Sequence, residues 1–320
     1  MSPAGGNPLP TRPLGDTGLA VTALCVGGGP LGSMPQNFGY DVSAERGVAT
    51  VRRVLDGPIN FLDTAAGYSD GESERRIGAA LADRGGLPDG FVLATKVDRD
   101  ADTGDFSGDQ VRRSVAGSLA RLGLETIQLL YLHDPEHISY EDGMATGGPV
   151  EALLRLRDEG VAQHIGLAGG PVELMSRYLE TGAFEVLITH NRWTLADRSA
   201  DELISAAVDR GIGVVNGAAY GGGMLAKGTA HSTDYAYRPA PPVVVERVRQ
   251  METACARYGV PLPAAALQFS MRDPRITSTI VGISRPERVD ETLRLAGWDI
   301  PDELWRIIEP LAAPPEEWQW

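Results

Sequence analysis

Eight short apolar runs that alternate with helix-like segments constrain the fold of this chain more than any other feature of its sequence. Each run is apolar along its length, which is typical of parallel strands covered on both faces. The runs are LCVGG, NFLDT, FVLATKV, QLLYLHD, HIGLAGG, EVLITHN, GVVNGAA and STIVGIS. Apolar residues recur at helical spacing between them, in the segments 45–55, 73–81, 110–122, 150–157, 172–179, 200–208 and 286–295.

Eight strand–helix units favour a (β/α)8 barrel over a doubly wound sheet. A doubly wound sheet would carry a glycine-rich turn between its first strand and a helix. VGGGPLG at 26–32 supplies the glycines, but the residues that follow, SMPQNFGYD, have no helical pattern. We therefore predict a single α/β domain over residues 1–320, a TIM barrel with its core at about 12–311.

Additional segments are expected at both ends of this barrel. RPLGDTGLAVTAL predicts an N-terminal β-hairpin with a turn near Asp16. Three longer connections, 34–43, 136–148 and 225–242, are expected to lie over the C-terminal mouth.

Composition and charge exclude several classes of protein. The 29 basic and 43 acidic side chains leave a formal charge of −14, which repels nucleic acid and anionic lipid. No apolar run approaches the ~20 residues that cross a bilayer, and MSPAGGNPLPTRP lacks the features of a signal peptide. The only cysteines, Cys25 and Cys255, have no disulfide or metal spacing. We predict a cytoplasmic protein with neither a nucleic-acid nor a membrane partner.

Polar side chains interrupt the apolar pattern at the carboxyl ends of three consecutive predicted strands. Asp63, Lys96 and His133 occupy these positions, and Tyr68 follows Asp63 by five residues. In a barrel these strand ends surround the active site. Alone, Asp63 would be read as a helix cap and Tyr68 or His133 as packing residues. Lys96 is harder to explain in this way, because an unpaired ammonium in an apolar strand costs several kcal/mol.

The four residues together form an acid–base set. A phenol with a pKa near ~10 is a poor acid at neutral pH. A neighbouring lysine ammonium favours the phenolate, and an aspartate keeps that lysine charged and oriented. We expect Tyr68 to exchange the proton, Lys96 and Asp63 to tune it, and His133 to hold the oxygen of the substrate.

These motifs resemble the aldo-keto reductase superfamily from about residue 12 to about residue 295. The segment DTAAGYSDGESERRIGAAL is similar to the strand-two signature of that family, and RPLGDTGLAVTAL, TK and LLYLHD agree with it. The resemblance implies that Tyr68 is the general acid or base of an oxidoreductase. It also implies NADP(H) or NAD(H), bound in extended form at the mouth, as the cofactor.

Further matches concern the residues that would hold this cofactor. THNRWTLADR resembles the family segment that stacks an aromatic ring on the nicotinamide, which implies this role for Trp193. Arg192 stands where Gln or Glu is usual in the family, and GVVNGAAYGGGMLAKG is closer to the sugar 1-dehydrogenase and pyridoxal 4-dehydrogenase branch. The complete expected set is Gly27, Gly28, Asp63, Asn191, Arg192, Trp193, Ala218, Tyr220, Gly222, Gly223, Gly282, Ser284, Arg285, Arg288, Glu291 and Thr292.

The resemblance leaves the choice of dinucleotide open. Members that prefer NADP have a lysine before the last helix and an arginine in its first turn. In VGISRPERVDET, Gly282 replaces that lysine and Arg288 retains the arginine, with Arg285 as a possible substitute. We expect activity with both cofactors, with NAD more competitive than is usual in the family.

Two other functions stay open. HDPEH offers His133, Asp134 and His137 to a metal-dependent barrel hydrolase, although Pro135 interrupts the helical pairing of the histidines. A non-catalytic NADP-binding regulatory subunit is also possible, because potassium-channel β subunits resemble this family. No metal is expected at the leading site. The expected substrate is a small carbonyl compound or sugar with polar groups, and a homo-oligomer is neither required nor excluded.

Overall fold

In the computed structural model, which describes residues 9–318, eight parallel strands close into a barrel. The strands are β3 (Leu24–Gly27), β4 (Phe61–Asp63), β5 (Val92–Val97), β6 (Ile127–His133), β7 (Ala162–Gly169), β8 (Val186–His190), β9 (Gly213–Gly217) and β12 (Ser278–Gly282). They follow one another in chain order around the barrel, and β12 closes it by pairing with both β3 and β9. Each strand overlaps a predicted apolar run, although β6 and β7 begin one and two residues before theirs, so the predicted (β/α)8 fold is confirmed.

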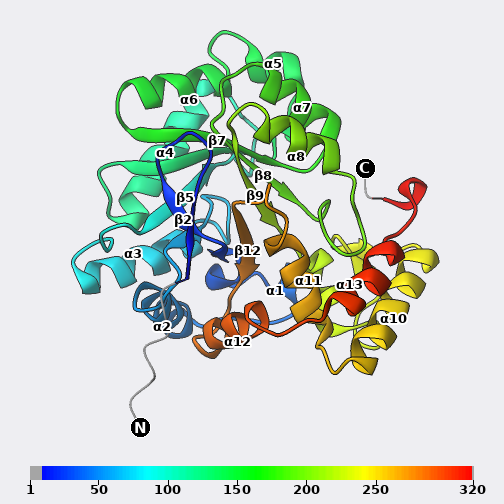
Figure 1. Ribbon diagram of the computed structural model, residues 1–320. Helices are drawn as coiled ribbons and strands as arrows, with labels where there is room; N and C mark the ends of the chain where they lie inside the picture. Colours follow the sequence, from blue (N-terminus) through cyan, green and yellow to red (C-terminus); the bar gives the residue numbers. More distant parts are fainter. Residues whose placement is uncertain (1–8, 319–320) are drawn as a thin grey trace.

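Helices surround the strands on the outside (Figure 1). The helices in the connections between strands are α2 (Ala44–Leu55), α3 (Glu72–Arg84), α4 (Gly108–Leu122), α6 (Pro149–Asp158), α7 (Val172–Glu180), α8 (Asp201–Val208), α10 (Pro242–Arg257) and α11 (Leu262–Met271). Two more, α12 (Glu287–Ala296) and α13 (Asp302–Ile308), follow β12. Local capping fixes the ends of α4: the Ser107 hydroxyl accepts the Gln110 N–H, and Gly123 ends the helix with a φ of 69°.

Helical periodicity did not single out α10, α11 or α13. Seven of the ten residues of α11 are buried, so its sequence is apolar around most of its circumference. The Val243–Val245 run near the start of α10 has β-branched side chains that favour strands.

The barrel interior is filled by large side chains and closed at its amino-terminal end by a hairpin. Strands β1 (Thr11–Pro13) and β2 (Ala20–Thr22) form this predicted hairpin. Leu14 in its turn is fully buried, and the Asp16 N–H donates to the Gly211 carbonyl at 2.9 Å. The Tyr131 ring lies inside the barrel because Gly166 on the adjacent strand leaves room, where a Cβ would come within 2.4 Å of that ring.

The three long connections contain short elements that border the carboxyl end of the barrel. The first holds α1 (Pro35–Phe38), preceded by the 3-10 turn η1 (Gly29–Gly32), and the second holds most of η2 (Pro135–His137) and α5 (Tyr140–Met144). The third holds most of α9 (Met224–Lys227), preceded by η3 (Gly221–Gly223), and a hairpin of β10 (Asp234–Tyr235) and β11 (Arg238–Pro239). Two more 3-10 turns, η4 (Glu309–Leu311) and η5 (Pro315–Glu317), lie near the end of the chain.

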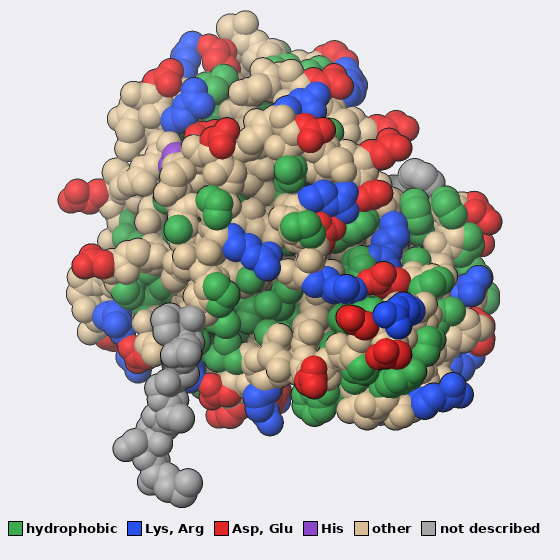
Figure 2. Space-filling model, viewed as in Figure 1, with side chains coloured by type: hydrophobic (Ala, Val, Ile, Leu, Met, Phe, Trp, Pro, Cys, Tyr) green, Lys and Arg blue, Asp and Glu red, His purple; other side chains and the backbone are tan. Residues whose placement is uncertain are grey.

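Charged side chains are dispersed over the surface. On the face shown in Figure 2, lysine and arginine side chains are scattered among aspartates and glutamates. None of the helices in the described range 9–318 is long and apolar enough to cross a membrane. The first eight residues, on which the signal-peptide expectation partly rests, lie outside that range.

Candidate active site

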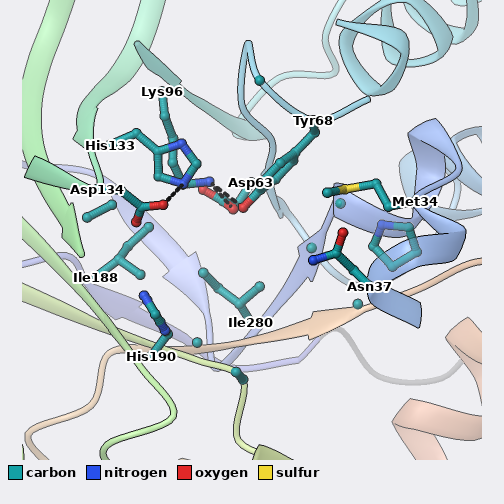
Figure 3. A pocket seen from close by; sticks show the side chains of 18 of the residues that line it. Met34, Asn37, Asp63, Tyr68, Lys96, His133, Asp134, Ile188, His190 and Ile280 are labelled. Atoms are coloured by element: carbon teal, nitrogen blue, oxygen red, sulfur yellow. Dashed lines mark hydrogen bonds and ion pairs between the residues drawn. The ribbon is translucent and has the colours of Figure 1, made fainter. Parts of the chain in front are cut away.

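A cavity of about 520 Å³ lies at the carboxyl end of the barrel strands. Asp63, Tyr68, Lys96 and His133 all line it. Figure 3 shows their side chains converging from neighbouring strand ends, with Ile188, His190 and Ile280 across the cavity. The structure therefore brings together all four residues of the predicted acid–base set.

Lys96 is the centre of this group. Its ammonium donates to the Asp63 carboxylate at 2.6 Å, to the Thr64 carbonyl at 2.8 Å and to the Tyr68 hydroxyl at 3.2 Å. Lys96 and Asp63 are each only 2% exposed. Burial lowers the pKa of Lys96, but Asp63 and Tyr68 more than offset this effect and raise the pKa above its ordinary value. The lysine is therefore a permanent cation beside the phenol.

The pKa of Tyr68 corrects one expectation from the sequence. Burial raises the pKa of the Tyr68 phenol, and the Lys96 ammonium lowers it, but the net direction is upward. The expected effect of the lysine is present, yet the burial of the phenol exceeds it, and the charges of Asp63 and Asp134 add to the rise. Lys96 thus limits a rise in the phenol pKa and does not produce a net fall.

His133 is held by a carboxylate that sequence reasoning missed. Its Nδ1 lies 2.6 Å from the Asp98 Oδ1, and the other Asp98 oxygen accepts the Gly67 N–H at 2.6 Å. The imidazole packs edge-on against the Tyr68 ring, with ring centroids 5.7 Å apart. Asp98 follows β5 by one residue and Lys96 by two. This position at the end of a strand was the only indication of Asp98 in the sequence, and an ordinary acid in a loop would give the same pattern.

A polar wall of the cavity comes from the ends of β6 and β8. Asp134 and His190 line the cavity, and Glu136, which does not line it, completes a group in which each residue places a ligand-type atom within 4.8 Å of the others. Burial lowers the pKa of His190 to about 4, so its imidazole is neutral near pH 7. In the sequence, Asp134 was considered only together with His133 and His137, as possible metal ligands. His190 was not predicted, although it interrupts an apolar run in the same way as His133 does.

Four of the expected cofactor residues border the cavity along with Asp63. Gly27, Ala218, Tyr220 and Gly282 line it. Gly28 lies behind this wall, where its N–H donates to the Asp63 carbonyl at 2.7 Å. A Cβ at Gly28 would come within 2.9 Å of that carbonyl oxygen. Gly28 therefore allows the ends of β3 and β4 to approach each other closely.

Trp193, which was expected on the nicotinamide, does not line this cavity. Its indole is 8% exposed and packs against Phe269 of α11, with ring centroids 5.6 Å apart. The Cζ atoms of Arg198 and Arg275 lie 5.5 and 4.9 Å from the centroid of the indole ring. Asn191, just after β8, has a φ of 61° and redirects the chain so that Trp193 packs outside the barrel.

Asn191 and Arg192, which precede Trp193, are buried beside the cavity. The Asn191 amide donates to the His190 Nδ1 at 3.1 Å, and the Arg192 guanidinium donates to the His190 carbonyl at 3.3 Å. Both therefore contact His190, which does line the cavity. Gly222 and Gly223 adopt φ values of 74° and 129°, and a Cβ at Gly222 would lie 3.0 Å from the Tyr237 nitrogen.

The last group of expected cofactor residues lies in the loop after β12 and in α12. Arg285 donates to the Glu291 carboxylate at 3.0 Å. Arg288 is half-buried near Tyr220 and lacks an ion-pair partner among the residues that the structure describes. Ser284 and Thr292 are buried. Arg288 is thus the cation of this segment that is available to an anionic ligand.

Comparisons with known proteins identify dehydrogenases to which the chain is similar. The chain is 31% identical to D-threo-aldose 1-dehydrogenase from a Pseudomonas species, over 90% of this chain and 93% of the relative. It is 30% identical to pyridoxal 4-dehydrogenase from Microbacterium luteolum, over 93% of this chain and 96% of the relative. L-galactose dehydrogenase from Arabidopsis thaliana is 29% identical, with coverage of 97% and 96%.

A solved structure and a family match extend these similarities. An aldo-keto reductase from Bacillus halodurans superimposes with a TM-score of 0.76 at 23% identity, covering 95% of this chain and 96% of that chain. This likeness concerns the fold. Residues 23–313 match the Aldo/keto reductase family, and the named relatives are dehydrogenases. The chain belongs to the aldo/keto reductase family and is an oxidoreductase.

Proposed function

We propose that this protein is an NAD(P)-dependent oxidoreductase that transfers a hydride between a nicotinamide and a carbonyl or hydroxyl carbon of a polar substrate. The observation that carries the proposal is the contact of the Lys96 ammonium with the Tyr68 hydroxyl at 3.2 Å on the wall of the cavity. A buried cation beside a phenol is the arrangement that a proton-transferring tyrosine requires.

The residues around the cavity fit a nicotinamide dinucleotide. Gly27, Gly29, Gly217 and Gly282 line the wall without side chains, which leaves room for a flat ring and for close backbone approach. A Cβ at Gly217 would come within 3.2 Å of the His190 Cβ. At the β12–α12 end, Arg288 offers a cation to phosphate. A nicotinamide bound here would supply or accept the hydride.

The chain itself would supply the proton and the orientation. In reduction, the Tyr68 hydroxyl donates its proton to the substrate oxygen while the carbonyl carbon gains the hydride, which gives the alcohol. Lys96 stabilises the phenolate that remains, and Asp63 holds Lys96 in place. His133 lies beside Tyr68 and can hold the same oxygen. Ile188 and Ile280 contribute an apolar wall that limits water.

The charge of the cavity supports a neutral, polar substrate. Asp63 is balanced by Lys96 and Asp98 by His133, whereas Asp134, which also lines the cavity, lies near a neutral His190. This excess of negative charge opposes phosphate and carboxylate groups. The relatives named for D-threo-aldoses, pyridoxal and L-galactose suggest aldoses and pyridoxal as the first compounds to test.

A substrate panel tests the proposal. Free aldoses, pyridoxal and simple aldehydes would be assayed in both directions with NAD(H) and NADP(H), beside the matching sugar phosphates and uronic acids. We expect turnover of neutral compounds that persists in a chelator. Cofactor binding without turnover of any compound would favour a regulatory subunit. Turnover of an ester that a chelator abolishes would favour a metal-dependent hydrolase.

A further inference from the structure

We propose that Asp98 is a positioning residue that fixes His133 and the Tyr68 loop relative to each other and determines which His133 nitrogen faces the substrate. This inference rests on the proposed function, in which His133 holds the substrate oxygen. Asp98 comes from the end of β5, His133 from the end of β6 and Tyr68 from the loop after β4. One carboxylate therefore joins three consecutive strand–loop units.

The two oxygens of Asp98 have different partners. Oδ1 lies 2.6 Å from the His133 Nδ1, and Oδ2 accepts the Gly67 N–H at 2.6 Å. Gly67 immediately precedes Tyr68, so the second hydrogen bond holds the loop next to the phenol. A shift of Asp98 would consequently move both the imidazole and the tyrosine.

Close packing makes this contact specific. A Cβ at Gly67 would lie 2.9 Å from the Asp98 Cγ and about as near to both carboxylate oxygens. The glycine thus lets the loop backbone approach the carboxylate closely enough to donate its N–H. Asp98 also makes hydrogen bonds through its backbone, to the Ser114 hydroxyl at 3.2 Å and from the Gln110 amide at 3.2 Å, which fixes the start of its side chain.

The charges around His133 favour its protonated form. Burial lowers the pKa of His133, but Asp98 and Asp134 outweigh it and raise the pKa above its ordinary value. The Asp134 Oδ2 lies 3.8 Å from the His133 Nε2. The Lys96 ammonium opposes protonation. The remaining titratable groups that face His133 are Tyr68, Asp63 and the neutral His190.

The orientation of His133 has a chemical consequence. Because Asp98 accepts from Nδ1–H, the other nitrogen, Nε2, is left for the cavity. When the ring is charged, Nε2–H donates to a carbonyl oxygen, which assists reduction. When the ring is neutral, Nε2 accepts from an alcohol hydroxyl, which assists oxidation. Asp98 would therefore set the pH at which the enzyme changes from favouring reduction to favouring oxidation.

The test combines Asp98→Asn, His133→Gln and the double variant. In Asp98→Asn the carboxylate charge is lost with little change in shape, so the His133 pKa should fall. ¹⁵N NMR of the imidazole measures this pKa without any turnover. The reduction kcat/KM at neutral pH should fall about 10–100-fold, the cost of losing one charged hydrogen bond. The falling limb of its pH profile should move to lower pH.

A matched control exists at the other end of the barrel. Glu185 lies 2.8 Å from the His164 Nδ1 and accepts the Ile165 N–H at 3.1 Å, the same two kinds of partner as Asp98. Glu185→Gln should leave the His133 titration and the pH profile unchanged. The difference in unfolding free energy between Glu185→Gln and the wild type measures how much the loss of such a pair destabilises the fold.

Two results would overturn the inference. One is a His133 pKa in Asp98→Asn that equals the wild-type value. The other is an Asp98→Asn penalty that is as large in the His133→Gln background as in the wild type, because the part of the penalty that acts through His133 should disappear there and leave only the part that acts through the Gly67 N–H. If the wild type turns over none of the panel compounds, the proposed function fails, and the NMR titration still decides the role of Asp98.

Discussion

The Lys96 ammonium lies 3.2 Å from the Tyr68 hydroxyl, although the two residues are separated by 28 positions in the chain. Their approach depends on β4 and β5 being adjacent in the barrel, with Asp63 paired to Ala94 two residues before Lys96. The contact joins a permanent cation to the phenol, so the chemistry of the site should depend on both groups.

Replacing Tyr68 by Phe should remove the group that transfers the proton. We expect kcat to fall by roughly 10²–10⁴-fold, which is the usual contribution of a positioned acid or base. Cofactor affinity should change little, because the ring is retained. Steady-state rates and a cofactor titration check both parts. Wild-type turnover in the variant would show that the proton comes from another group.

Replacing Lys96 by Met, or Asp63 by Asn, should alter the pH at which Tyr68 ionises. Lys96 lowers the phenol pKa against the effect of burial, so its loss should raise that pKa further. The pH profile for alcohol oxidation, which needs the phenolate, should shift to higher pH in Lys96→Met. Asp63→Asn should shift it in the same direction, because Lys96 loses its orientation. Unshifted profiles in both variants would contradict the tuning role.

These two variants should also be less stable. Each leaves one charge of a buried ion pair without its partner, which typically costs about 3–5 kcal/mol. Denaturant unfolding measures the loss. It also identifies the conditions under which enough folded variant is present for the pH profiles.

Replacing Arg288 by Ala should weaken NADP selectively. Arg285 is engaged by Glu291, so Arg288 is the cation left for a 2′-phosphate, and its loss should reduce NADP affinity about 10–100-fold. NAD affinity should hardly change. Equal losses for both dinucleotides would show that Arg288 stacks on adenine or supports the fold. Gly282→Lys is the complementary variant and should tighten NADP, although its Cβ would lie 3.1 Å from the Pro30 Cγ.

Replacing His190 by Gln should make the free energy of unfolding less dependent on pH below 6.5. Burial lowers the pKa of His190 from 6.5 to about 4. Between these values the unfolded chain binds a proton that the folded protein does not, so stability falls as the pH decreases from 6.5 towards 4. Urea unfolding of wild type and variant across this window should show a smaller decline in His190→Gln. The exposed His231→Gln is the control, and identical slopes for wild type and His190→Gln would refute the assignment.

The strands and the four central residues could be predicted from the sequence because short stretches of neighbouring residues are enough to indicate each of them. Strands covered on both faces are apolar throughout, and Asp63, Lys96 and His133 interrupt that pattern at strand ends. The family resemblance added the pairing of Tyr68 with these residues. Similar local reasoning located the hairpin that closes the amino-terminal end.

Other features depend on contacts between distant segments and could not be predicted in this way. Asp98 matters because the end of β6 lies beside the end of β5, and no local pattern distinguishes it from a loop acid. Trp193 lies outside the cavity wall because the chain turns at Asn191 and the indole packs against Phe269 of α11. The net pKa of Tyr68 depends on the burial of the phenol and the charges around it, which only the folded cavity defines.

The most direct measurement for the central claim is the fate of the hydride. The wild-type protein would be incubated with a neutral aldehyde or aldose and nicotinamide dinucleotide deuterated at C4 of the reduced ring, and the alcohol product would be analysed by mass spectrometry. We predict that the product carries one deuterium at the former carbonyl carbon and that Tyr68→Phe forms it far more slowly. Product without deuterium from either face of the nicotinamide, or equal rates in wild type and variant, would contradict the account.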